Sequence, residues 1–258
     1  MRRHDRCLDR VARRAARVWP AVWALCLGAC ATVNRLPAAS YERGVAYHQR
    51  GQHREAVDTF EQFLRRSPTD SSAASAIKLK ALSLMALKEY PVAAVELQIL
   101  RHDFAGSEEA REAWYLEGLA HWKQVGRVER DVTEAREART CFRRALAENP
   151  DSRVAADARR YLMEISDLML RKKLGEAEVY AKLEQPAAAV LILGAALEEE
   201  QEGSLRPRAL MRRAQLALEA GDAATAAACW REVVERHAET PDAQVARRQL
   251  AGEAGIAP

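Results

Sequence analysis

Small, apolar and aromatic residues recur from residue 40 onward at spacings that predict pairs of antiparallel helices. In the first segment these residues fall where two such helices would touch, and they are Gly44, Tyr47, Ala56, Phe60, Phe63 and Pro68. Gly51 lies between the two predicted helices, at a turn that favours a residue able to adopt a positive φ. The spacing therefore predicts a helical hairpin that begins near Ser40 and ends near Pro68.

The same frame recurs four more times along the chain. The aligned residues are Ala81, Leu84, Ala93, Leu97 and Leu100 in the second copy; Trp114, Gly118, Ala138, Phe142, Ala145 and Pro150 in the third; Ala177, Tyr180, Ala189, Leu193 and Ala196 in the fourth; and Ala214, Ala217, Gly221, Ala226, Trp230 and Val233 in the fifth. Such a pattern is typical of tetratricopeptide repeats. One hairpin cannot bury its apolar face alone, so neighbouring hairpins are expected to stack.

The repeats predict an all-α fold, a right-handed solenoid of about five tetratricopeptide-like hairpins closed by a C-terminal capping helix. We expect this cap to run from Pro241 to Ala251, with Val245 and Leu250 facing inward. Two irregularities interrupt the period. The third copy is longer than the first, which predicts an insertion at residues 126–134 that protrudes as a loop. Residues 152–183 lack proline and are rich in helix-forming residues, which predicts one unusually long helix.

These features divide the chain into parts with different expected roles. Residues 40–150 form the N-terminal repeats 1–3, residues 151–183 form a long connecting helix leading into repeat 4, and residues 184–258 form the C-terminal repeats and the cap. Residues 1–29 have a different character. A basic stretch is followed by the apolar segment Val18–Leu27, which is the order found in secretory signals and is too short to span a bilayer.

The apolar segment ends in Leu27-Gly28-Ala29-Cys30, which resembles the lipobox of bacterial lipoproteins. The resemblance implies cleavage before Cys30, lipidation of its sulfur, and a lipidated tether at residues 30–39. The alternative is an ordinary signal peptide in which a cysteine falls near the cleavage site by chance. Ala31 is not the aspartate that resembles an inner-membrane retention signal, so we expect a lipid-anchored protein on the periplasmic face of the outer membrane.

Charge and cysteine usage narrow the function classes. Residues 1–29 hold 7 of the 40 basic and 2 of the 37 acidic residues, so the remaining chain has a small net negative charge with both signs interspersed. Nucleic-acid binding requires a clustered basic face, and we exclude that class of partner. Beyond Cys30 only Cys141 and Cys229 remain, and both are expected to be small packing residues in a core that does not depend on disulfides.

A search for catalytic patterns finds none that predicts an enzyme. The sequence lacks a phosphate-binding loop, a His-Glu-x-x-His zinc helix and a Gly-x-Ser-x-Gly nucleophile elbow. His48 and His53 are five residues apart, do not share a helix face, and are expected to be solvated surface residues. We therefore predict no catalytic residue, no cofactor and no metal site.

The first helices of repeats 1 to 3 carry the most informative surface. Their ligand-facing positions in the repeat frame are Tyr41, Val45 and His48; Lys78, Leu82 and Met85; and Tyr115, Leu119 and Trp122. Seven of these nine residues are apolar or aromatic, and such residues suit half-solvated binding surfaces. We predict a groove for an extended or helical peptide with aromatic and aliphatic anchors. The alternative is that these residues only thicken the core between helices.

Several short motifs follow one another from the third repeat onward. They are Trp114-Tyr115-Leu116-Glu117-Gly118-Leu119, Arg130-Asp131 in the insertion, Asn149-Pro150-Asp151-Ser152 and Ala155-Ala156-Asp157-Ala158. In this order they resemble the BamD family, the lipoproteins of the machinery that assembles β-barrel proteins in the bacterial outer membrane. Two places depart from the family's pattern, Ser67-Pro68-Thr69-Asp70 after the first repeat and Leu183-Glu184 in the fourth.

The resemblance implies a scaffold for outer-membrane protein assembly. Its N-terminal repeats would bind unfolded outer-membrane proteins, and its C-terminal repeats would bind the POTRA domain of a BamA-like barrel protein. Arg130 and Asp131 would form a partner-contact loop, and other assembly lipoproteins are further candidate partners. A second hypothesis is a different tetratricopeptide lipoprotein that coordinates cell-wall enzymes or pilus and secretin assembly, because the repeats and Cys30 fit it equally well.

Overall fold

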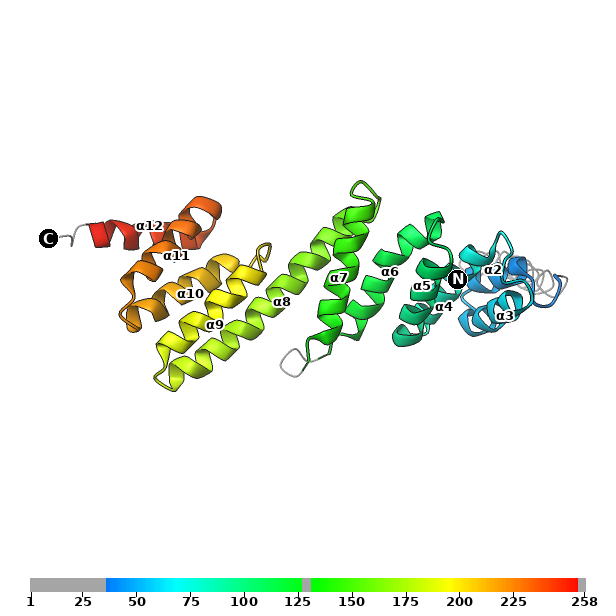
Figure 1. Ribbon diagram of the computed structural model, residues 1–258, viewed down its shortest axis with the longest axis horizontal. Coiled ribbons are helices and arrows are strands. Elements are labelled where there is room, and N and C mark those ends of the chain that lie inside the picture. The colour runs from blue at the N-terminus through cyan, green and yellow to red at the C-terminus, as the bar shows by residue number, and fades with distance from the viewer. Residues whose placement is uncertain (1–35, 127–130, 255–258) are drawn as a thin grey trace, which may run out of the picture. The chain divides into compact units, whose positions relative to one another are not determined.

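The computed structural model describes residues 36–126 and 131–254, and these residues form eleven α-helices connected by short turns (Figure 1). Consecutive helices pair as the five predicted hairpins, and a single helix follows them. The helices are α2 (Tyr41–Gln49), α3 (His53–Arg66), α4 (Ala73–Ala86), α5 (Tyr90–Asp103), α6 (Glu108–Gln124), α7 (Thr133–Glu148), α8 (Ala155–Lys182), α9 (Pro186–Glu199), α10 (Arg206–Glu219), α11 (Ala223–Arg236) and α12 (Pro241–Ala254).

The chain divides into two compact units, one ending at Ala113 and the other beginning at Trp114. In the first unit, the contact between α2 and α3 depends on Gly44, because a Cβ there would lie 2.5 Å from Cε1 of the buried Phe60. Gly51 adopts a φ of +73° in the turn between these helices, as the repeat pattern predicts. A glycine at each of these places therefore permits the tight first hairpin.

The second unit repeats this contact in its first hairpin. A Cβ at Gly118 on α6 would lie 2.9 Å from Cδ1 of Phe142 on α7. The Phe142 ring is fully buried and stacks on Tyr161 of α8, with ring centroids 5.1 Å apart. One aromatic ring thus joins three consecutive helices of this unit.

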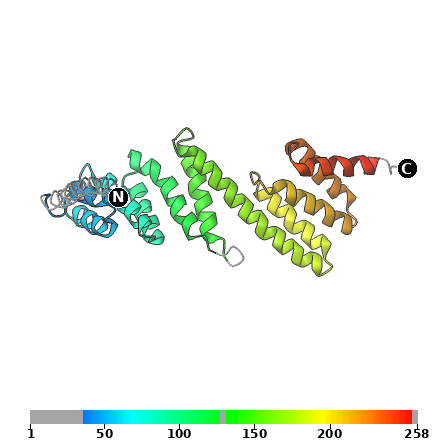
Figure 2. The same ribbon diagram turned by 180° about the vertical axis from the view of Figure 1, so that it is seen from behind.

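Helix α8 is 28 residues long and belongs to two cores of the second unit. Its first half contributes Leu162 and Ile165 to a cluster with Phe142, and its second half contributes Leu170 and Ala177 to the cluster around α9, α10 and α11. Helices α8 and α9 lie side by side in both views (Figures 1 and 2). At 1.5 Å per residue, α8 spans about 42 Å and links the two cores with one rigid element.

Arg206 at the start of α10 is buried and links several elements of the second unit. Its guanidinium donates hydrogen bonds to the backbone oxygens of Leu197 and Glu200 and to the carboxylate of Glu232 on α11. The Glu200 side chain in turn accepts from Arg139 on α7. Because a buried charge is costly unless it is paired and hydrogen-bonded, this network compensates for the burial of the Arg206 guanidinium.

Two details of the expected fold are wrong. Val245 does not face inward, since it is 37% exposed, and the inner face of α12 is formed by the fully buried Ala243 and Ala246 with Leu250. The expected inward pair was five residues apart, which does not match the helical period. The insertion does not protrude over its whole length, because Thr133 begins α7 and Val132 is buried. Among the described residues, no helix is long and apolar enough to cross a membrane.

Candidate functional site

The first helices of repeats 1 and 2 are neighbours in the first unit. His48 Nδ1 on α2 lies 2.8 Å from Ser83 Oγ on α4, and the Ser83 hydroxyl donates its hydrogen to the backbone oxygen of Leu79. His48 is therefore the donor in the bond to Ser83. Lys78 on α4 pairs with Glu112 at the beginning of α6, with 3.1 Å between Nζ and Oε2. These bonds align the helices that carry the predicted groove residues of this unit.

Six predicted groove residues lie in this first unit, and each is half-buried: Tyr41, Val45, His48, Lys78, Leu82 and Met85. The Tyr41 ring packs on the core, with its centroid 6.2 Å from that of Phe60 and 6.0 Å from that of Phe63. Val45 packs on the same cluster. These side chains thus contact the core while keeping part of their surface in solvent.

The other three predicted residues, Tyr115, Leu119 and Trp122, lie in the second unit and are also half-buried. The Tyr115 ring is 5.8 Å from Phe142, and the Trp122 ring is 6.2 Å from Tyr161. Burial raises the pKa of the Tyr115 hydroxyl, with a smaller contribution from Tyr161. Tyr115 and Trp122 therefore support the core of this unit, and their remaining surface is available to a ligand.

The histidines of the first hairpin are not the solvated surface residues expected from their spacing. His48 and His53 are both half-buried, and their rings meet edge to face with centroids 5.5 Å apart, because the tight turn at Gly51 brings α3 back against α2. Burial lowers the pKa of His48, and the neighbouring His53 lowers it further. His48 thus acts as a neutral hydrogen-bond donor at neutral pH.

Asp131, one of the two predicted partner-contact residues, has a structural role at the start of α7. It is exposed and its carboxylate accepts a hydrogen bond from the backbone N–H of Thr133, with 2.8 Å between the atoms. Hydrogen bonds from the side chain and the backbone of Thr133 lower the pKa of Asp131. Arg130 and Cys30 both lie outside the described residues.

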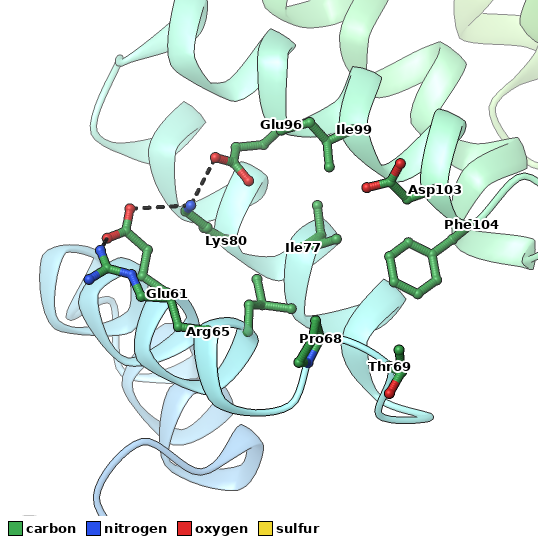
Figure 3. Close-up of a pocket in the computed structure, with 11 residues that line it drawn as sticks. Glu61, Arg65, Pro68, Thr69, Ile77, Lys80, Glu96, Ile99, Asp103 and Phe104 are labelled. Atoms are coloured by element: carbon green, nitrogen blue, oxygen red, sulfur yellow. Dashed lines mark hydrogen bonds and ion pairs between the residues drawn. The ribbon is translucent and has the colours of Figure 1, made fainter.

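A cavity of about 740 Å³ in the first unit was not anticipated from the sequence (Figure 3). It lies between α3, α4 and α5, and its lining residues are Glu61, Leu64, Arg65, Pro68, Thr69, Ile77, Lys80, Glu96, Ile99, Asp103 and Phe104. At one end, the buried Lys80 places its Nζ 2.8 Å from Glu96 Oε1 and 3.2 Å from Glu61 Oε1. The rest of the wall is largely apolar.

The groove prediction considered only the first helix of each hairpin. The second helices contribute to this cavity and also carry exposed apolar residues. On α5, Val92, Val95 and Ile99 are exposed at helical spacing, a signal that the sequence does contain. On the α8–α9 hairpin, Val179, Leu183 and Leu191 are exposed, and Leu191 is 73% exposed. Exposed apolar side chains mark a binding surface where they form one contiguous patch.

Tandem helical hairpins that stack along the chain define a helical repeat protein of the tetratricopeptide kind. Comparison with known proteins places the chain within that class. It belongs to the YfiO family of outer membrane lipoproteins, whose model matches residues 34–199, and a tetratricopeptide repeat model matches residues 208–240. The predicted all-α tetratricopeptide fold and the predicted family are both confirmed.

A relative from Caulobacter vibrioides, the outer membrane protein assembly factor BamD, is 26% identical over 181 residues. The match covers 70% of this chain, and the chain spans 59% of the length of that relative. Among solved structures, the TPR2AB domain–pHSP90 complex of yeast Sti1 has a TM-score of 0.42 at 12% identity, and the match covers 82% of this chain and 81% of the Sti1 chain. A thermophilic tetratricopeptide protein from Thermus thermophilus has a TM-score of 0.35 at 21% identity and covers 83% and 96%. Scores of this size carry no inference about function.

The family also bears on the other predictions from the sequence. The expectation of an outer-membrane lipoprotein that is not an enzyme is confirmed, since the family is described as outer membrane lipoproteins and the relative as an assembly factor. The matched region begins at residue 34, after Cys30, so lipidation of that cysteine remains a prediction.

Proposed function

We propose that this protein is a lipid-anchored scaffold for the assembly of β-barrel proteins on the periplasmic face of the outer membrane. The observation that carries the proposal is membership of the YfiO family, together with the likeness to an outer membrane protein assembly factor over 70% of the chain. In this proposal the chain supplies surfaces that bind other proteins, and its partners carry out the folding of the barrels.

The first-helix faces of repeats 1 and 2, in the first unit, and that of repeat 3, in the second unit, are each proposed to bind segments of unfolded outer-membrane proteins. Three of the nine groove residues are aromatic, and each combines a packed ring with remaining solvent exposure. Such residues lose little conformational entropy when they bind, because the core already restricts their rotamers. They suit an extended substrate segment with aromatic side chains.

The C-terminal repeats are the proposed docking region for the POTRA domain of a BamA-like barrel protein. The exposed Val179, Leu183 and Leu191 on the α8–α9 hairpin support this assignment, since removal of exposed apolar side chains from water favours association with a partner. Other assembly lipoproteins would attach elsewhere on the array. No nucleic acid is involved.

Cys30 is the proposed anchor, and its position suits a scaffold that works at a membrane surface. Ten residues separate Cys30 from Tyr41, the first residue of α2. A short tether keeps the first repeat near the bilayer and raises the local concentration of the scaffold around membrane-embedded partners. A Cys30→Ser protein should therefore fold normally yet support assembly poorly.

Copurification tests the proposed partner. The tagged lipoprotein, solubilised from membranes, should bring down a barrel protein that contains POTRA domains. Leu191→Glu should reduce that recovery, because it places a charge in the apolar contact, whereas Met163→Glu on the exposed face of α8 serves as a matched control and should not. If the unmodified protein repeatedly recovers no such barrel, the proposed function is wrong.

Peptide binding tests the groove. Replacement of Tyr115 and Trp122 by alanine should weaken the capture of a peptide with an aromatic C-terminal segment by more than about 1 kcal/mol. Because both rings also pack on the core, the melting temperature must be measured on the same samples. Destabilisation with unchanged peptide affinity in the folded variants would assign both residues to the core alone.

A further inference from the structure

Three potential metal ligands of different chemistry converge between α6 and α7 in the second unit. Glu117 and His121 are four residues apart and share one face of α6, and Cys141 projects from the facing side of α7. One ligand atom from each residue lies within 4.8 Å of the others. We propose that Glu117, His121 and Cys141 form a binding site for a divalent transition metal, with zinc as the ion that fits best.

The position of Cys141 follows from the close packing of this hairpin. The Cβ of Cys141 lies only 3.2 Å from where a Cβ of Gly118 would be, so the thiol must project beside the residues that flank Gly118 on α6. Glu117 is 2% exposed and Cys141 is 4% exposed. The backbone contact thus places a carboxylate and a thiol together in a region shielded from water.

The orientation of His121 is set by a fourth residue, Glu134 on α7. His121 Nδ1 lies 2.7 Å from Glu134 Oε2, and because a carboxylate can only accept, Nδ1 carries the hydrogen of this bond. The other ring nitrogen, Nε2, faces Glu117 at 3.9 Å from Oε1. A histidine that donates one N–H to a carboxylate and directs its other nitrogen at an ion is the usual arrangement in metal sites.

The donor set favours zinc over calcium or magnesium. Zinc binds thiolate sulfur at about 2.3 Å, imidazole nitrogen at about 2.0–2.1 Å and carboxylate oxygen at about 2.0–2.2 Å. The ligand atoms already lie within 4.8 Å of one another, so side-chain rotations would bring them to these distances from one ion. Calcium and magnesium prefer sites made only of oxygen atoms. On binding, the Cys141 thiol releases its proton to solvent, and a water molecule completes the tetrahedral coordination.

Binding of the metal alone tests the proposal. The full chain, purified from membranes in detergent and freed of metal, is titrated with cobalt(II) chloride and then with zinc chloride. We expect one equivalent of cobalt to bind, with the charge-transfer absorption of a cobalt–thiolate bond, and zinc to displace it because zinc binds such sites more tightly. Glu134→Gln should weaken binding by about 10–100-fold, since it removes the carboxylate charge that strengthens the hydrogen bond to His121 and raises the basicity of its imidazole.

The chain offers a matched control for the thiol. Cys141→Ser should abolish the cobalt–thiolate absorption, while Cys229→Ser, which alters an equally buried cysteine at the equivalent position of the fifth repeat, should leave it intact. His121→Gln provides a second loss-of-binding variant if Cys141→Ser fails to fold, and circular dichroism verifies each variant. The proposal is overturned if the unmodified chain gives no thiolate absorption, or if the absorption survives in the folded Cys141→Ser or His121→Gln protein.

Discussion

The third and fifth hairpins of the chain place a cysteine at the same position and give it opposite electrostatic surroundings. Cys141 precedes the buried Phe142 on α7, and Cys229 precedes the buried Trp230 on α11. Where the third repeat has the acid Glu117 next to Gly118, the fifth has Arg213 next to Ala214. Packing thus places the two thiols alike, while the charged residue at this neighbouring position differs in sign.

In the fifth repeat the Arg213 side chain supplies a positive charge beside the cysteine. The third repeat would acquire its positive charge by binding the proposed metal ion. Burial raises the pKa of the Cys229 thiol, and the adjacent Arg213 guanidinium opposes that shift. Arg213 also lies against Gly194 of α9, where a Cβ would come within 2.9 Å of its Nη2 atom. Ala217 replaces His121 in this repeat, so no second ligand is present at that position. A repeat frame can therefore keep its core contacts while the charge inside the hairpin is reversed.

The largest test of the shared frame is removal of its aromatic residue. Phe142→Ala and Trp230→Ala should each lower the free energy of unfolding by about 3–5 kcal/mol, because both side chains are buried and each leaves a large cavity. Urea denaturation followed by circular dichroism measures the loss. A small effect at one position only would show that the two aromatic residues are not equivalent parts of one frame.

A smaller test concerns the closeness of the two helices in each hairpin. Gly118→Ala should cost about 1–3 kcal/mol of unfolding free energy by overpacking, since the new methyl group would lie 2.9 Å from the Phe142 ring. The gain in helix propensity, about 1 kcal/mol, offsets part of that loss. In the fifth repeat the reverse change, Ala214→Gly, should cost about 1 kcal/mol through lost propensity.

The same denaturation experiment shows whether Gly118→Ala destabilises or stabilises the protein. If Gly118→Ala stabilises the protein, helices α6 and α7 can separate without loss, and the third hairpin is not packed more closely than the fifth. Such a result would also weaken the proposed metal site, because the position of Cys141 relative to α6 depends on that close approach.

The repeat frame itself was predictable from the sequence, because it depends on local spacing. Small residues opposite aromatic ones, such as Gly118 opposite Phe142 and Ala214 in the fifth copy, are required wherever two helices touch, and they were visible at fixed offsets. The turn glycines Gly51 and Gly221 were also visible, and both have positive φ. Local sterics therefore specify most of the fold.

The candidate sites were harder to predict, because they combine residues through tertiary contacts. His121 and Glu134 meet across an insertion of irregular length, so no fixed spacing relates them. The cavity beside Lys80 combines residues of α3, α4 and α5, and the exposed Leu191 lies on the second helix of its hairpin, where the frame specifies only the inward positions. Residues 30 and 130 lie outside the described part of the chain, so the predictions for Cys30 and Arg130 rest on sequence patterns alone.

The smallest expected difference between the two hairpins is in their response to acid. His237 ends α11 at the position where Asn149 ends α7, so only the fifth repeat has a titratable residue there. Burial lowers the pKa of His237, and the nearby Arg206 lowers it further. The folded state therefore binds a proton less readily than the unfolded state, whose histidine has a pKa of about 6.5. The contribution of His237 to stability is complete above that pH and falls as the pH decreases toward the lower folded pKa.

His237→Asn copies the third repeat into the fifth and removes this dependence. We expect the free energy of unfolding of the unmodified chain to decrease more steeply between pH 7 and pH 5 than that of the variant, because only the former must suppress protonation of a half-buried imidazole. Asn149→Gln, a change at the other cap without a titratable group, is the matched control and should leave the slope unchanged. Parallel pH profiles for all three proteins would mean that His237 is solvated in the folded state, and the two caps would then be electrostatically equivalent.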